Sequence, residues 1–312
     1  MAWLSKFAAT VIILLAPAAA LNYSAVYHGW MHSCEDAPIK IRIGNGGAGQ
    51  SGLIQALADT FIQFCLVRGI EPFRIAWYES DTTYSLASLK TGDIDVAITY
   101  NRFAEHEAVK QGYVDDDAPF YIFNDHFLLV GPRANPANLS QDNTVEEMFS
   151  AIFHAAEGEE TMPPVRFLSR FDKSATNILE SNFWIKIGQV PWANTPSPWY
   201  HQFSAFPREA LIHAIEYEEY TLTDRGTFLS LPRYLRNSIT VFKAGTDDGN
   251  DPLLNAAYLS VGTRAQNVSL ARFFGRWTMH PNGQTVIKHF GKGEEPLYSG
   301  SPIRTLDELG RM

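Results

Sequence analysis

The spacing of hydrophobic positions changes along the chain, and each change marks a predicted helix or strand. Over residues 53–65 apolar side chains recur at helical spacing, at Leu53, Ile54, Leu57, Phe61, Phe64 and Cys65. Short apolar or alternating runs predict strands over 41–44, 73–78 and 95–99. Helices are predicted over 84–90 and 104–111. Strands that alternate with helices in this way imply a parallel α/β sheet.

A second set of elements follows the apolar run at 127–130, which Gly131 and Pro132 interrupt. The polar stretch 133–140 predicts a connection into a second lobe. This lobe would contain helices over 145–156, 175–187 and 209–218, and strands over 165–169 and 220–223. The predicted strand 257–261 and helix 270–280 would return to the first lobe. Two lobes joined by two crossings enclose a cleft, where small ligands usually bind.

The composition is that of a globular protein with ordinary cores. The 312 residues are 46% hydrophobic and 13% aromatic, which suffices for two lobes. A formal charge of −9 argues against a general nucleic-acid-binding surface. It does not exclude a small anion, because backbone N–H groups and one arginine can hold one. We therefore expect no nucleic-acid partner.

The first twenty residues have the pattern of a secretory signal peptide. Lys6 precedes the apolar stretch 8–15, and alanines at 18–20 offer a cleavage site. The apolar stretch is too short to span a membrane, and no cysteine follows it for a lipid anchor. The polar end at 306–312 shows neither a GPI tail nor a retention signal. We predict a signal peptide over 1–20 and a secreted, extracellular protein without a membrane anchor.

A secreted chain can carry glycans and disulfides. Asn-x-Ser sequons predict glycosylation candidates at Asn22, Asn138 and Asn267. The two cysteines, Cys34 and Cys65, allow two readings. They form a disulfide bond in the oxidising compartment, or Cys65 is a core thiol on the apolar face of the predicted helix.

The most informative segment is the glycine-rich stretch over 44–52 (GNGGAGQSG). It follows an apolar run and precedes a predicted helix, an arrangement that aims unpaired backbone N–H groups at an anion. It also fits two nucleotide-binding patterns. One requires a lysine where Gln50 stands, and the other implies cofactor chemistry that is not expected of a secreted protein. We therefore expect a small-oxyanion site or a structural turn here, and no cofactor.

Two other segments combine charged side chains with hydroxyls. The stretch 167–176 (FLSRFDKSAT) places Arg170 ahead of a predicted helix start, which suits an anion or, alternatively, a capped helix with a surface arginine. The stretch 220–228 (YTLTDRGTF) places Asp224 and Arg225 between a strand and a glycine. Alone, this second stretch is compatible with turn chemistry and a local ion pair.

In this order, the three segments resemble the tungstate-binding proteins of bacterial uptake transporters, within the type II periplasmic binding protein superfamily. The resemblance covers roughly residues 38–300, and 220–227 is its most specific part. Shorter stretches that also match are 51–53, 92–96, 124–127, 130–132, 251–254 and 272–283. The resemblance implies mixed sheets with helices on both faces. It further implies lobe I over 38–130 plus 252–300 and lobe II over 131–251, closing on an oxyanion at facing helix N-termini.

The resemblance also implies a set of ligand-binding residues. Arg170 matches the arginine that reaches the anion, where we expect it at the rim of the cleft, and Ser174 and Thr176 match hydroxyls of its loop. The full candidate set comprises Asn45, Gly46, Gly47, Ser51, Thr82, Arg170, Ser174, Thr176, Asp224 and Arg225.

The chain departs from the family in its first loop and in its context. The family's hydroxyl-rich first loop is here glycine-rich, so the predicted ligand is either a tungstate- or molybdate-like oxyanion or an organic carboxylate. The sequons and the unlipidated signal indicate a fungal-type eukaryotic member. No matching membrane transporter is expected for such a member, and the sequence identifies no transporter partner.

These observations predict a monomeric, non-enzymatic solute-binding protein for a small anion. The alternatives are an extracellular hydrolase on the same fold and an interaction module without a ligand. The spacing over 49–52 does not match a nucleophile elbow. We predict no metal site, because no short ligand motif occurs among the scattered histidines His106, His126, His154, His201 and His213. The acidic residues over 115–117 and 247–251 are expected to lie in solvated loops rather than to bind calcium.

Overall fold

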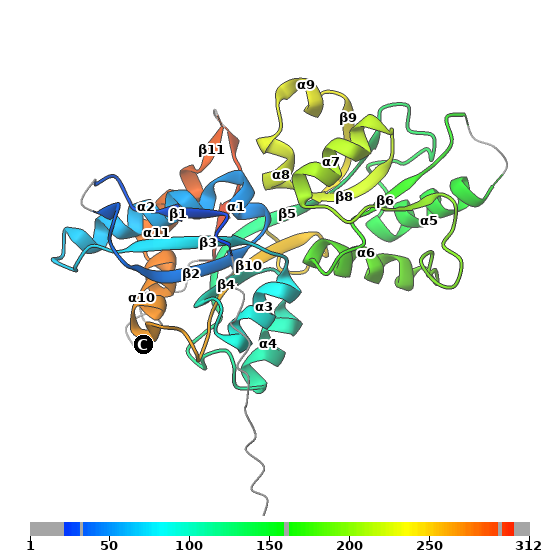
Figure 1. The fold of residues 1–312 in the computed structure, drawn as a ribbon. Helices are drawn as coiled ribbons and strands as arrows, with labels where there is room; N and C mark the ends of the chain where they lie inside the picture. The colour runs from blue at the N-terminus through cyan, green and yellow to red at the C-terminus, as the bar shows by residue number, and fades with distance from the viewer. Residues whose placement is uncertain (1–21, 32–33, 159–161, 293–294, 303–312) are drawn as a thin grey trace, which may run out of the picture.

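The structure is a computed structural model that describes residues 22–31, 34–158, 162–292 and 295–302. The predicted signal peptide and the polar C-terminal stretch lie outside these residues. Its elements form two groups, which Figure 1 shows on either side of the long strand β5. No helix in the described part of the chain has the length and apolar character needed to cross a membrane.

The first group contains the N-terminal elements and the return segment. Its strands are β1 (Ala25–Tyr27), β2 (Ile39–Asn45), β3 (Arg74–Glu79), β4 (Val96–Thr99), β10 (Leu254–Val261), β11 (Gly291–Lys292), β12 (Glu295–Pro296) and β13 (Ser299–Gly300). Its helices are α1 (Gly47–Ser51), α2 (Leu53–Leu66), α3 (Thr82–Thr91), α4 (Arg102–Lys110), α10 (Val268–Met279) and α11 (Pro281–His289).

The second group lies between these two parts of the chain. Its strands are β6 (Phe167–Ser169), β7 (Tyr200–Gln202), β8 (Tyr220–Asp224) and β9 (Ile239–Ala244). Its helices are α5 (Val145–Glu157), α6 (Ala175–Lys186), α7 (Pro207–Glu216), α8 (Arg225–Ser230) and α9 (Arg233–Arg236). Strand β5 (Phe120–Pro132) belongs to both groups.

The described strands form one mixed sheet with the order β1-β3-β2-β4-β10-β5-β8-β6-β7, and a two-stranded ribbon of β11 and β12. The pairs β2–β3, β2–β4, β6–β7 and β6–β8 are parallel. Strands β10 and β5 run antiparallel to their neighbours. The prediction of mixed α/β architecture is therefore confirmed. The parallel arrangement holds for β2, β3 and β4, whereas β1, β5 and β10 make antiparallel pairs.

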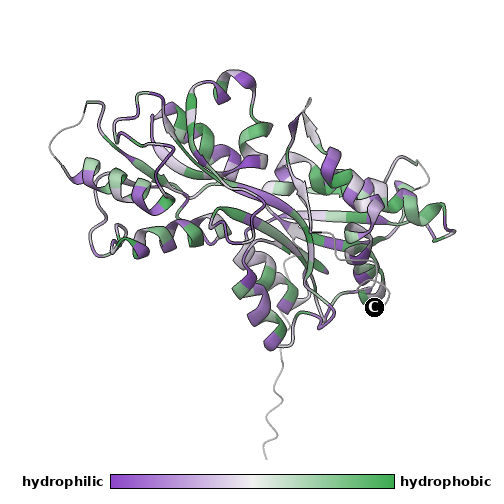
Figure 2. Cartoon of the chain, turned by 180° about the vertical axis from the view of Figure 1, so that it is seen from behind, coloured by the Kyte–Doolittle hydropathy of each residue, from purple (hydrophilic) through white to green (hydrophobic). Residues whose placement is uncertain are grey.

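Strand β5 joins two hydrophobic cores. Its first half pairs with β10 and its second half pairs with β8 and β9. Phe123 belongs to the first core and Phe127 to the second, and the three polar residues between them are 3% exposed each. In Figure 2 most helices carry green and purple stripes, as expected for helices with one face on a core. The boundary between the cores therefore falls inside a strand, at Asn124, Asp125 and His126.

Several described elements were not predicted, because they are short or poor in local signal. Helix α1 is one turn of glycine-rich chain, and tertiary contacts stabilise it. The Asn45 side chain accepts a hydrogen bond from the Gly49 backbone at 2.8 Å. Strand β7 and helix α9 have three and four residues, too few for a hydrophobic period to show.

Both cysteines are buried free thiols, so the predicted disulfide is absent from the structure. They belong to the first hydrophobic core, and Cys65 lies on the buried face of α2. The alternative reading of Cys65, a core thiol, is the one that the structure shows. Burial also raises the pKa of the Cys65 thiol to about 12, which disfavours the thiolate needed for oxidation.

Close packing against Trp77 requires a glycine at position 49. A Cβ there would lie 2.2 Å from the Trp77 ring, and the Trp77 Nε1 group donates to the Asn45 carbonyl at 2.8 Å. This contact seats α1 against β3. Any side chain at position 49 would force the indole away.

We expect Gly49→Ala to lower the free energy of unfolding by about 1–3 kcal/mol, the usual cost of overpacking. The matched control is Gly249→Ala, because a Cβ at position 249 meets nothing within 4 Å. The control should stay within about 0.5 kcal/mol of the wild type in urea unfolding. Equal effects from the two substitutions would contradict the packing role of Gly49.

Candidate functional site

A small cavity lies where the two groups of elements face each other. Its volume is about 40 Å³, and a single water needs about 10–15 Å³. The lining residues come from both groups: Gly46, Gly47, Ser80, Asp81, Thr82, Ile98, Tyr100, Asp125, Arg170, Ser174, Ala175, Thr176, Phe206, Pro207, Asp224 and Asn255. The space is right for a compact ion rather than a large planar molecule.

Contacts between the two walls keep the cavity closed. The Thr83 hydroxyl donates to the Lys173 carbonyl at 2.9 Å, and the Lys173 ammonium lies 5.4 Å from the centre of the Tyr84 ring. On the other side, Gln50 donates to the Glu209 carboxylate at 3.3 Å. The structure therefore represents a closed conformation, held by polar contacts at the surface.

The first residues of five helices line the cavity, those of α7 and α8 among them. The other three helices are α1, α3 and α6. Gly46 and Gly47 begin α1, Asp81 and Thr82 begin α3, and Ser174 and the residues after it begin α6. The first N–H groups of a helix have no partner within the helix, and its N-terminus carries partial positive charge. The N-cap side chains accept hydrogen bonds from only some of these N–H groups. Asp81 accepts from the Tyr84 N–H at 2.8 Å, and Ser174 accepts from the Asn177 N–H at 3.2 Å.

Arg170 supplies the formal positive charge in the cavity wall. Its side chain is only 6% exposed, so our expectation of a residue at the cleft rim is wrong. The guanidinium is tied down: it donates to Asp172 at 2.6 Å, to the Ala205 carbonyl at 3.1 Å and to the Thr176 hydroxyl at 3.4 Å. These contacts fix its orientation before a ligand arrives, which lowers the entropic cost of binding.

Two buried carboxyl groups lie in the same wall. Burial, and then the neighbouring Asp224, raise the pKa of Asp125 well above its usual range. Asp125 Oδ1 accepts from the His126 and Gly226 N–H groups, and the Asp224 oxygens accept from the Thr227 N–H and hydroxyl at 2.7 Å. The raised pKa of Asp125 favours its neutral form, which lowers the negative charge in this wall of the cavity.

Tyrosine hydroxyls add donors around this pair. Desolvation, and then the nearby Asp125, raise the pKa of Tyr100 and of Tyr298. Both groups therefore stay protonated at neutral pH. Tyr100 lines the cavity, whereas the Tyr298 hydroxyl lies 2.8 Å from that of Ser51 behind it.

The structure brings most of the candidate residues to the cavity. Those that line it are Gly46, Gly47, Thr82, Arg170, Ser174, Thr176 and Asp224. Asn45 is fully buried behind α1, where it bonds the Ile98 carbonyl and the Gly49 N–H. Ser51 bonds the Ala48 carbonyl, and Arg225 begins α8 outside the lining set.

The sequence reasoning did not identify several of the lining residues. Asp125 lies in a stretch that matches the family, but the sequence analysis gives it no role. The sequence feature that marks it is a run of three polar residues within an otherwise apolar strand. Asp81 has the signal of an N-cap aspartate ahead of a helix. The fold alone brings Tyr100, Phe206 and Asn255 to the cavity.

Other sequence predictions concern residues away from the cavity. Asn22 and Asn138 are exposed, and Asn267 caps α10 by accepting from the Leu270 N–H. In the acidic loops, Asp115 pairs with Arg272, and Asp247 accepts hydrogen bonds from Asn124 and Ser299. Among the described residues, one group of three side chains could hold a metal ion, and it lies outside the cavity.

Comparisons with known proteins agree with this geometry. The family model for the "PBP superfamily domain" matches residues 33–282. The tungstate-binding protein TupA of Peptoclostridium acidaminophilum is 29% identical over 260 residues, covering 82% of this chain and 81% of its own. A candidate ABC transporter anion-binding protein of Haloferax volcanii is 26% identical over 243 residues. That match covers 76% of this chain and 66% of the relative, just under two thirds of its length.

Solved structures give the same picture. A periplasmic protein described as a candidate metal-binding protein is 50% identical, with a TM-score of 0.82, and the match covers 90% of this chain and all of that chain. The tungstate ABC transporter structure from Geobacter sulfurreducens is 23% identical with a TM-score of 0.63, over 81% of this chain and 98% of its own, and shares the fold. The relatives named here are bacterial and archaeal, and they do not support the expected eukaryotic origin.

The raised pKa of Asp125 predicts a pH-dependent stability. Above the ordinary value of 3.8, the folded state keeps a proton that the unfolded state releases, so stability falls as pH rises towards the folded pKa. Asp125→Asn removes this penalty and keeps an oxygen acceptor and an N–H donor. At pH 7 we therefore expect Asp125→Asn to raise the free energy of unfolding.

The advantage of Asp125→Asn should shrink as pH falls towards 4, where the unfolded state also begins to hold the proton. Urea unfolding at pH 4, 5.5, 7 and 8.5 measures the trend. Asp36→Asn is the matched control, since Asp36 is exposed. A difference that does not vary with pH would show that Asp125 is ionised in the folded protein.

Proposed function

The chain belongs to the PBP superfamily, and from this membership and the cavity we propose that it is a solute-binding protein for a compact oxyanion. Tungstate and molybdate are the first candidates, because tungstate-binding proteins are among its relatives. The observation that carries the proposal is the convergence of five helix N-termini and Arg170 on one cavity of about 40 Å³.

The electrostatics of the cavity support an anionic ligand. Backbone N–H groups at the starts of α3 and α6 offer donors from two sides, and Arg170 offers an oriented charge. The small volume favours a tetrahedral oxyanion over the larger planar carboxylate that the glycine-rich loop suggested.

The proposal includes the organisation and location of the protein. Lobe I would comprise residues 38–130 and 252–300 and lobe II residues 131–251, with the ligand bridging them. Secretion rests on the signal-peptide pattern over 1–20, and glycans at the exposed sequons remain predictions. The relatives are named for binding rather than catalysis, and we propose the same for this chain.

A thermal-shift panel tests the ligand class. Tungstate, molybdate, phosphate, sulfate and small carboxylates are added separately to the purified protein. A ligand at a hundredfold excess over its Kd adds about 2.7 kcal/mol to the free energy of unfolding, which is a rise of several degrees in Tm. We expect tungstate or molybdate to give the largest rise. A flat response across the panel would contradict the proposal and favour an interaction module without a ligand.

Substitution of Arg170 tests the site. Arg170→Lys keeps the charge but loses the fork that contacts the loop, so affinity should fall by about 1.5–3 kcal/mol, or roughly ten- to a hundredfold. Arg233→Ala, at an exposed position on α9, is the control and should bind as the wild type does. Calorimetry with the best anion from the panel measures both. Unchanged affinity in Arg170→Lys would remove Arg170 from the site.

A further inference from the structure

A second set of polar side chains lies at the edge of the sheet, outside the anion cavity. His201 lies on β7, His213 on α7, and Glu219 directly precedes β8. None of the three lines the cavity. We propose that His201, His213 and Glu219 form a binding site for a divalent transition-metal ion, and that this ion is Zn²⁺.

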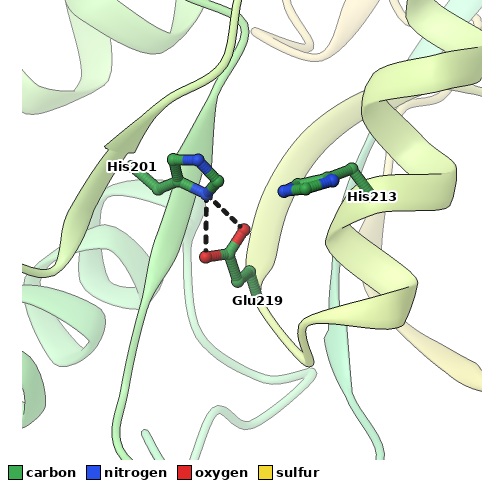
Figure 3. Close-up of side chains that lie close together, drawn as sticks. All are labelled: His201, His213 and Glu219. Carbon is green, nitrogen blue, oxygen red and sulfur yellow. Dashed lines mark hydrogen bonds and ion pairs between the residues drawn. The ribbon is translucent and has the colours of Figure 1, made fainter.

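The three side chains converge. One ligand atom from each lies within 4.8 Å of the others, and His201 Nδ1 is 3.0 Å from both oxygens of Glu219. Figure 3 shows a ring nitrogen of His213 facing this pair. Zinc bound at about 2.0–2.1 Å from each ligand in tetrahedral geometry brings the ligand atoms to roughly 3.4 Å apart. Small side-chain rotations are enough to reach that spacing.

The ring of His213 is held in place by stacking. It lies 4.1 Å from the Phe203 ring at an interplanar angle of 7°, and 4.2 Å from the Tyr217 ring at 27°. Within the described residues its ring nitrogens make no hydrogen bond. Stacking on both faces fixes the orientation of this imidazole and leaves its ring nitrogens available to coordinate a metal ion. Stacking alone would be served equally well by a third aromatic ring.

The carboxylate of Glu219 needs a positive charge. Its side chain is 1% exposed, and its described side-chain partner is His201. A buried carboxylate is costly unless it is paired or coordinates a metal ion. A dication shared with the two imidazoles would offset this cost, and imidazole with carboxylate is a ligand set that suits zinc.

The site is reachable from solvent. An open groove of about 440 Å³ borders it, and His201, Glu219 and Tyr217 contribute to the groove wall. His201 retains 34% of its side-chain exposure. Three protein ligands with an open side match the pattern of zinc sites that keep a position for water or another small ligand. The exposed Arg166 also borders the groove and favours a negatively charged fourth ligand.

The fold, rather than a sequence motif, assembles this site. The two histidines are twelve positions apart and lie on a strand and a helix, so no short ligand pattern marks them. The sequence analysis predicted no metal site among the scattered histidines, whereas the fold places His201 and His213 as neighbours, with ring centres 5.2 Å apart.

Metal titration of the purified protein, without a polyhistidine tag, tests the proposal. Calorimetry with Zn²⁺ should show one saturable site per chain. His213→Phe keeps the aromatic stack and removes a ligand, so we expect affinity to fall at least tenfold. His106→Phe, at an exposed histidine on α4, is the matched control and should bind as the wild type does. Absence of saturable binding, or equal affinity in the two variants, would overturn the site.

A second measurement leaves the three proposed metal ligands unchanged. Co²⁺ held by two imidazoles and a carboxylate in tetrahedral geometry absorbs visible light strongly, whereas Co²⁺ on surface carboxylates absorbs weakly. We expect the strong bands in the wild type and in Arg170→Lys, which should lose anion affinity alone. Weak bands in the wild type, or loss of the strong bands in Arg170→Lys, would contradict a separate metal site.

Discussion

The structure depends on one strand, β5, that is shared by two hydrophobic cores. Apolar residues at its two ends pack into different cores, so the strand can bury both ends only if it runs straight between them. The middle of the strand then lies between the cores, where Asn124, Asp125 and His126 are buried. This placement brings a carboxyl group to the cavity, next to Asp224 of the antiparallel neighbour β8. The fold and the polar site therefore have the same origin.

The charge balance of the cavity follows from this arrangement. Its wall holds Arg170 together with several carboxyl groups, which at first sight oppose an anion. Asp81 caps α3, Asp224 accepts from the Thr227 N–H and hydroxyl, and burial raises the pKa of Asp125 well above its usual range. What remains facing the centre is dominated by helix N-termini. Local chemistry, rather than the overall charge of −9, determines which ion the cavity accepts.

Much of the fold could be predicted from the sequence, because its long elements have clear periods. The apolar face of α2, the strand β3 and the helices α5 and α6 all appear near their predicted positions. The short elements α1 and β7 could not be predicted, since residues distant in the sequence stabilise them. The site divides in the same way. Gly47 and Arg170 are marked by local patterns, whereas Tyr100, Asn255 and the His201–His213 pair are brought together only by topology.

The continuity of β5 also determines how the molecule can move. Linkers of irregular chain let two bodies swivel, but a strand hydrogen-bonded on both sides resists local rotation. Any separation of the two cores must bend β5 and β10 together, and it must strain the bonds from Asp247 to Asn124 and His126 at the crossing. Opening the cavity would therefore deform these two strands and their hydrogen bonds, rather than rotate a loose linker.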